Sequence, residues 1–236
     1  MSTDTLLQLE LDPRSSAPLD RSVLQPCSDD TASLKIERAG HVAYVHVPDS
    51  HDALLPLLVV MHGAGKDKVW NLKESVQAWA QRAKRYNILV LYPASFDSTW
   101  DYIRSRARED LNFIQFSING MRRAFNVDDS RIALCGISDG GSMALSLATH
   151  NPGLFQVAMS VSAGFCAGPP PVRSRTHAPK LFVKHGAEDK MFPLKRIGLR
   201  LQDKLKQAGY TVEFRIGKGQ GHIPPAWQGE FLADWL

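Results

Sequence analysis

The chain has few cysteines, little net charge and no long apolar run, and each shortage argues against a class of protein. Its 236 residues include three cysteines, an odd number without regular spacing, which argues against a disulfide framework or a metal site. The net charge is only +4, so we expect no nucleic-acid partner. No apolar stretch approaches the roughly 18 residues that span a bilayer, and the first residues do not resemble a signal peptide. We therefore expect no stable membrane insertion and a cytoplasmic location.

Apolar strands alternate with helices from about residue 32 onward. We expect residues 1–31, which are polar and contain prolines, to form a loosely ordered arm before a single domain over residues 32–236. Strands are predicted at 33–38, 41–47, 56–61, 88–92, 131–135, 156–162, 180–184 and 211–216. Helices are predicted at 69–85, 110–125, 139–150, 194–208 and 224–236. This order predicts an α/β fold with about eight mostly parallel strands, the first pair antiparallel, and helices on both faces.

The most informative motif is a G-x-S-x-G turn around Ser138. An apolar strand precedes it, and the predicted helix from Asp139 follows it. The glycines at 136 and 140 let strand and helix cross closely, and the turn presents the serine hydroxyl at the end of the sheet. The pattern predicts a nucleophilic serine, which needs a base and an acid to activate it.

An acid and a histidine follow Ser138 in the order Ser, Asp, His. Asp189 follows the strand 180–184, and we prefer it as the acid to its neighbour Glu188, because Pro193 can start the next helix and leave the turn aimed at the site. A helix-entry acid is the alternative interpretation of Asp189. His222 stands in a glycine-rich loop after the last strand and is the candidate base. His185 is expected to pack structurally.

The third element of the expected site is the segment 59–65, which ends in His-Gly-Ala-Gly after a buried strand. Acyl transfer places negative charge on a carbonyl oxygen, which two preset backbone N–H groups stabilise. We expect these donors to be the N–H of Asp139 and the N–H of Ala64. His62 is expected to brace this loop.

These motifs together resemble the α/β-hydrolases, and among them the phospholipase/carboxylesterase group of compact esterases. More distantly, the chain is similar to polyhydroxybutyrate depolymerases and feruloyl esterases. The resemblance covers residue 33 to the end and rests on the motifs above and on Thr99-Trp100-Asp101. It implies the α/β-hydrolase fold, a catalytic triad of Ser138, Asp189 and His222, and an oxyanion hole at Ala64 and Asp139.

Other expectations concern the substrate site. Trp100 and Phe165 are candidate pocket-wall residues, with core packing as an equal alternative, and Met191 is a third candidate for substrate binding. Asp110 matches a family acid at a helix start, which helix-dipole stabilisation also explains. Only residues 163–179 could form a cap, so we expect little or no lid.

The expected reaction is hydrolysis of carboxylic esters with small or short-to-medium acyl groups through an acyl-enzyme. The triad requires no metal or other cofactor. We expect a small-molecule ester as the partner, and a monomer or homodimer. An acyl-thioesterase or lysophospholipase would use the same triad, and a non-catalytic ligand receptor is possible on the same fold.

Overall fold

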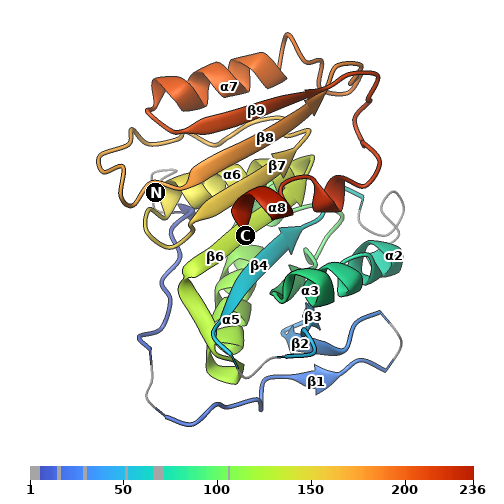
Figure 1. Cartoon of the computed structure of the whole chain (residues 1–236), viewed down its shortest axis with the longest axis vertical. Helices are drawn as coiled ribbons and strands as arrows, with labels where there is room; N and C mark the ends of the chain where they lie inside the picture. The colour runs from blue at the N-terminus through green and yellow to red at the C-terminus, as the bar shows by residue number, and fades with distance from the viewer. Residues whose placement is uncertain (1–5, 15–16, 29–30, 51–52, 66–71, 106) are drawn as a thin grey trace. The chain divides into compact units, whose positions relative to one another are not determined.

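The computed structural model describes residues 6–14, 17–28, 31–50, 53–65, 72–105 and 107–236 (Figure 1). The chain divides into two compact units. We call Met1–Gln8, Met61–Ala64 and Ala133–Leu236 the C-terminal unit, and Leu9–Val60 and Gly65–Ile132 the N-terminal unit. The chain passes for the last time from the N-terminal to the C-terminal unit between Ile132 and Ala133, within strand β6 (Val127–Ile137).

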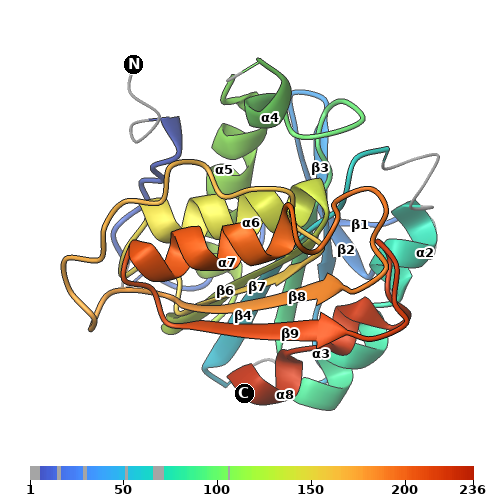
Figure 2. The same cartoon turned by 90° about the horizontal axis from the view of Figure 1, so that it is seen from above.

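The C-terminal unit is built on four parallel strands: β6 (Val127–Ile137), β7 (Val157–Val161), β8 (Lys180–Gly186) and β9 (Val212–Gly217). Their register pairs Ala133 with Val157, Val157 with Lys180, and Leu181 with Val212. Figure 2 shows α6 (Asp139–His150) and α7 (Gly198–Gln207) on one side of these strands and α8 (Leu232–Trp235) on the other. Strand β7 is accordingly buried along its whole length and β8 along nearly all of it, as parallel strands between helices are, whereas β9 is mostly half-buried.

The N-terminal unit contains β1 (Gln25–Pro26), β2 (Leu34–Arg38), β3 (His41–His46), β4 (Leu55–Met61) and β5 (Leu89–Pro93). The spatial order is β1-β2-β3-β5-β4, antiparallel from β1 to β5 and parallel between β5 and β4. Ala39 and Gly40, both at positive φ, turn the β2–β3 hairpin where the sequence predicts it. Helix α5 (Glu109–Ala124) packs against β2, β3 and β5. The remaining helices are α2 (Leu72–Gln77), α3 (Ala80–Tyr86) and α4 (Asp101–Ser105).

The predicted α/β alternation is confirmed, and α6 has the predicted bounds. The strand number is corrected: the described residues form nine strands, because Gln25–Pro26 adds a short edge strand to β2. The sequence prediction also missed the five-residue helix α4. Between β7 and β8, residues 163–179 are all described and form no helix or strand.

Three predicted helices differ from the structure. The helix predicted at 69–85 begins outside the described residues, and its described part breaks into α2 and α3 at Trp79, whose side chain is fully buried. The helix predicted at 194–208 begins only at Gly198. The closing helix at 224–236 reduces to a 3-10 turn, Trp227–Gly229, and to α8. There a left-handed Ala226 bends the chain, and both Trp227 and Leu232 are buried.

Parts of the expected N-terminal arm make specific contacts. Leu7 is buried within the C-terminal unit, where its carbonyl oxygen accepts a hydrogen bond of 2.8 Å from Asn151 Nδ2. Within the N-terminal unit, Arg14 Nε donates to Asp129 Oδ2 at 2.8 Å. The division into an arm and a single domain stays a prediction.

Candidate active site

Ser138 sits on the sharp turn between β6 and α6. Its φ of 54° and ψ of −120° are strained for a residue with a side chain, and its N–H donates to Val161 O at 2.9 Å. A Cβ at Gly136 would collide with the carbonyl oxygen of Gly140, and a Cβ at Gly140 would collide with that of Met61. The turn can therefore form only with glycine at both positions, and it holds the serine in one orientation.

Asp189 lies in the turn that follows β8, and its carboxylate shapes that turn. Its Oδ1 accepts the backbone N–H groups of Met191 at 2.9 Å and of Phe192 at 2.8 Å. Asp189 is only 4% exposed, whereas the rival acid Glu188 is exposed. The buried acid of the pair is thus the one that the sequence favours.

The loop that carries His222 rests directly on the turn that carries Asp189. Glu188 N–H donates to Gln220 O at 2.9 Å, which ties the two loops together. A Cβ at Gly186 would collide with the carbonyl oxygens of Gln220 and Gly221. The absence of a side chain at Gly186 therefore lets the histidine loop approach the acid.

Two hydrogen bonds join the three side chains. His222 Nδ1 lies 2.8 Å from Asp189 Oδ2, and His222 Nε2 lies 2.9 Å from Ser138 Oγ. Because an ionised carboxylate only accepts, we assign the imidazole proton to Nδ1, which leaves Nε2 to accept the serine proton. The structure therefore brings together the nucleophile, base and acid that the sequence predicts, all within the C-terminal unit.

The expected oxyanion loop approaches the start of α6 within the same unit. A Cβ at Gly140 would collide with the carbonyl oxygens of both Met61 and His62. The His62 ring is buried, with Nδ1 2.7 Å from the carbonyl oxygen of Gly63, as expected for a residue that braces the loop. The exposed Ala64 follows this segment, and Asp139 is the first residue of α6. Both predicted donors thus belong to segments that meet at Gly140.

Comparison with protein families gives a match to the phospholipase/carboxylesterase family over residues 96–233, more than half of the 236-residue chain. The chain belongs to this family. The match covers Ser138, Asp189 and His222, so the candidate triad lies inside the region that the family shares.

One relative of this chain is a bifunctional acetylxylan esterase/xylanase of Neocallimastix patriciarum, which is 29% identical to it over 156 residues. The aligned region is 64% of this chain but only 22% of the relative, so the chain spans about a fifth of that protein's length.

Solved structures share the fold at low sequence identity. A thermostable esterase superposes with a TM-score of 0.63 at 19% identity, covering 90% of this chain and 61% of that one. An acetyl xylan esterase from Aspergillus awamori superposes with a TM-score of 0.62 at 16% identity, covering 90% of this chain and 98% of that one. These similarities confirm the α/β-hydrolase fold.

The candidate substrate-binding residues differ in exposure. Met191 is 65% exposed, whereas Trp100 is 1% exposed and lies in the N-terminal unit. Phe165 is half-buried, and its backbone N–H lies 3.4 Å from Ser142 Oγ. Sequence reasoning missed Phe192, whose ring meets the His222 ring edge-on at 5.1 Å and 84°. Its only sequence signal was an aromatic residue in the turn of the acid.

Asp110 anchors the segment before α4 within the N-terminal unit. It is 2% exposed, and it accepts the N–H groups of Phe96 and Asp101, each at 2.8 Å. His41 Nε2 lies 3.1 Å from the same carboxylate. Burial raises the pKa of Asp101 to about 6, and the negative charge of Asp110 acts in the same direction. Asp110 therefore has a structural explanation that does not require contact with a substrate.

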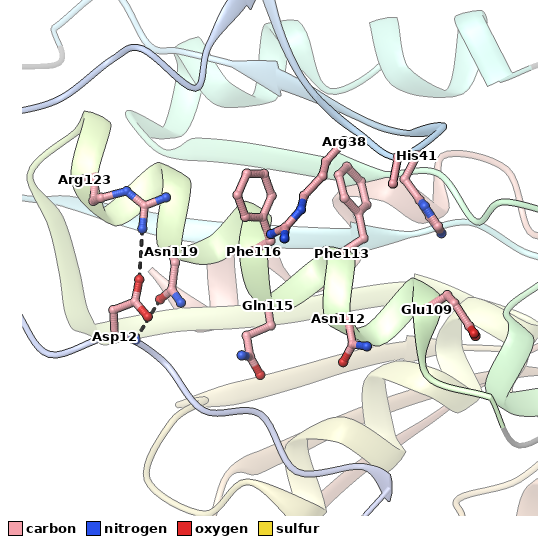
Figure 3. A pocket seen from close by; sticks show the side chains of 11 residues that line it. Asp12, Arg38, His41, Glu109, Asn112, Phe113, Gln115, Phe116, Asn119 and Arg123 are labelled. Atoms are coloured by element: carbon pink, nitrogen blue, oxygen red, sulfur yellow. Dashed lines mark hydrogen bonds and ion pairs between the residues drawn. The ribbon is translucent and has the colours of Figure 1, made fainter.

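The N-terminal unit also contains an open hollow of about 670 Å³ along α5 (Figure 3). An ion pair of 2.9 Å between Arg123 and Asp12 lies at one end, and Arg38 stacks over the Phe116 ring at 4.4 Å. None of the predicted site residues lines this hollow. We assign it no part in the chemistry at Ser138.

Among the residues that the structure describes, no group of histidine, cysteine and acidic side chains could hold a metal ion. Within the same residues, no helix is long and apolar enough to cross a membrane.

Proposed function

We propose that this chain is a serine carboxylesterase that hydrolyses esters of small acyl groups, acetyl among them, through an acyl-enzyme at Ser138. The observation that carries the proposal is the pair of hydrogen bonds from Asp189 through His222 to Ser138, at 2.8 and 2.9 Å. Membership of the phospholipase/carboxylesterase family supports ester chemistry. A serine hydroxyl becomes a useful nucleophile when a neighbouring imidazole takes its proton.

In the acylation step, Ser138 Oγ forms a bond to the ester carbonyl carbon while its proton moves to His222 Nε2. The carbonyl electron pair moves to the oxygen, which the N–H groups of Asp139 and Ala64 stabilise. The buried carboxylate of Asp189 stabilises the imidazolium through its hydrogen bond to Nδ1. The intermediate then breaks its bond to the alkoxy oxygen, which takes the proton from His222 and leaves as the alcohol.

In the deacylation step, a water molecule repeats the sequence. His222 takes a proton from the water molecule as the water oxygen attacks the acyl carbon. The same two N–H groups stabilise the resulting oxyanion. The bond to Ser138 Oγ breaks, Oγ recovers a proton from His222, and the carboxylic acid leaves. The strained φ of 54° at Ser138 supports this scheme, because it holds Oγ facing His222 rather than in solvent.

The names of related proteins support a small acyl group. The Neocallimastix patriciarum relative is named an acetylxylan esterase/xylanase, and the Aspergillus awamori structure is an acetyl xylan esterase. Residues 163–179 form no helix that could act as a lid over a long acyl chain. We therefore place acetyl esters, with a carbohydrate as the alcohol, first among the substrates to test.

The proposal is tested with p-nitrophenyl esters from acetate to palmitate, alongside release of acetate from acetylated xylan. We expect turnover to be highest for short chains and to vanish in Ser138→Ala. Ser174→Ala, at an exposed serine of the same unit, is the matched control and should keep the wild-type rate. A folded wild type that turns over no ester, or a Ser138→Ala variant with undiminished turnover, would refute the proposal.

A further inference from the structure

We propose that His185 is a positioning residue for the active site, because its imidazole fixes the turn that carries Asp189 and Phe192. The inference rests on the function proposed above and assigns a role to a side chain outside the triad. His185 stands near the carboxyl end of β8, four positions before Asp189, and is fully buried. Its contacts include the turn of the acid and the start of α7.

The imidazole of His185 contacts the turn of the acid at Phe192 and Asp189. Its Nε2 lies 2.6 Å from the carbonyl oxygen of Phe192 and 3.4 Å from Asp189 Oδ2. Both of these oxygens accept, so Nε2 carries the proton and donates it to the nearer one. Phe192 also donates its own N–H to Asp189 Oδ1 at 2.8 Å. The backbone of Phe192 is therefore fixed on one side by Asp189 and on the other by His185.

Packing alone does not account for an imidazole at this position. Its Nδ1 is buried and has no hydrogen-bond partner among the described residues. A buried polar atom without a partner costs stability, and a leucine would fill a similar volume without that cost. The donation from Nε2 to Phe192 is the interaction of His185 that a leucine cannot make. This difference makes leucine the informative substitution.

The ring of His185 has no room to turn away from Phe192. At Gly198, the first residue of α7, a Cβ would lie 2.8 Å from His185 Cγ, so the helix backbone abuts the ring. Asp189 is an ionisable group in contact with His185, and its Oδ2 also lies 2.8 Å from His222 Nδ1.

The side chain of Phe192 connects the turn of the acid to the base, His222. Its ring meets the His222 ring edge-on at 5.1 Å. A Cβ at Gly164 would lie 3.0 Å from the Phe192 ring, so the backbone of Gly164 also packs closely against this ring. A shift of the turn would therefore move the acid and the aromatic wall of the base together. Displacements of about 1 Å in a catalytic group cost on the order of 100-fold in rate.

The test compares His185→Gln with His185→Leu, because glutamine places an N–H group near the position of Nε2 and leucine does not. We expect kcat for p-nitrophenyl acetate to fall about 10- to 100-fold in His185→Leu with KM little changed. We expect His185→Gln to recover most of that loss. The rate at which a fluorophosphonate labels Ser138 should follow the same order. Val183→Ala, a buried position on the same strand, should lower the melting temperature without lowering kcat to this extent.

The possible outcomes separate this inference from the proposed function. If the leucine and glutamine variants have equal kcat, or if kcat in both variants only follows the melting temperature, the positioning role is refuted. If both keep wild-type kcat while Asp189→Asn loses it, the inference fails and the esterase stands. If the folded wild type hydrolyses no ester and its Ser138 reacts with no fluorophosphonate, the proposed function fails and this inference fails with it.

Discussion

Replacing Asp189 by asparagine tests the proposed chemistry most directly, because the structure indicates that the fold should tolerate it. Asp189 Oδ1 accepts the N–H groups of Met191 and Phe192 at 2.9 and 2.8 Å. An asparagine carbonyl oxygen can accept both bonds and keep the turn. The amide nitrogen then takes the place of Oδ2, 2.8 Å from His222 Nδ1. The substitution therefore changes the chemistry at one atom and preserves the shape.

The expected loss follows from the tautomer of His222. An amide group at this position donates to Nδ1, so the ring proton must move to Nε2. Nε2 faces Ser138 Oγ at 2.9 Å and would no longer accept the serine proton. An inverted tautomer of this kind costs about 10⁴ in kcat in serine proteases. At 1.36 kcal/mol for each factor of ten, this is about 5.4 kcal/mol of transition-state stabilisation.

The assay is kcat/KM for p-nitrophenyl acetate from pH 6 to 9, with thermal melting as the measure of folding. Glu188→Gln, an exposed acid in the same turn, is the matched control and should keep wild-type activity. An Asp189→Asn variant that keeps more than a tenth of wild-type kcat/KM would show that the carboxylate does not set the tautomer. Equal losses in both variants would point to a general effect of charge.

Two further predictions concern stability and thiol reactivity. Burial, together with the charge of Asp110, raises the pKa of Asp101 to about 6 from 3.8, so the folded state loses stability as pH rises from about 4 to 6. Asp101 is half-exposed, so we reduce the stability effect of this pKa shift to about 1 kcal/mol to allow for solvent screening. The melting temperature of Asp101→Asn should therefore be about 2–4 °C above that of the wild type at pH 7.5 and no higher than the wild type at pH 4. An equal rise in melting temperature at both pH values would contradict this. Burial also raises the pKa of the Cys166 thiol to about 11, and Cys135 is buried. A thiol titration of the native protein at pH 8 should therefore find Cys27 reacting first, with all three thiols reacting in guanidinium; fast reaction of Cys166 in the native state would refute this.

The turn at Ser138 could be predicted from sequence because the constraints that shape it are mostly local. Gly136 is needed because strand and helix cross within a few residues of the serine, whereas Gly140 is needed because the carbonyl groups of Met61 and His62 lie against it. Helix α6 accordingly begins and ends at the predicted residues. The choice of Asp189 over Glu188 had similar support, since the turn before Pro193 brings its carboxylate to the backbone N–H groups that follow it.

Helix boundaries were predicted poorly where distant packing decides them. The apolar period over 69–85 suggests one helix, but the described part breaks where Trp79 becomes fully buried. The sequence 224–236 has apolar residues at suitable spacing, yet a left-handed Ala226 turns the chain and Trp227 is buried. In both segments the burial of a large aromatic side chain takes precedence over the helical period, which a single sequence does not reveal.

The surroundings of the base were hidden from sequence for a related reason. Met191 and Phe192 are adjacent, and no sequence pattern tells which of them faces His222. The Asp189 carboxylate binds both of their N–H groups, so the chain turns tightly here. Met191 is left 65% exposed, while the Phe192 ring reaches the imidazole. The direction of each side chain depends on the contacts that fix the backbone of this turn. One of them is the contact of 2.6 Å between His185 Nε2 and Phe192 O, which joins residues seven positions apart and which no local sequence pattern encodes.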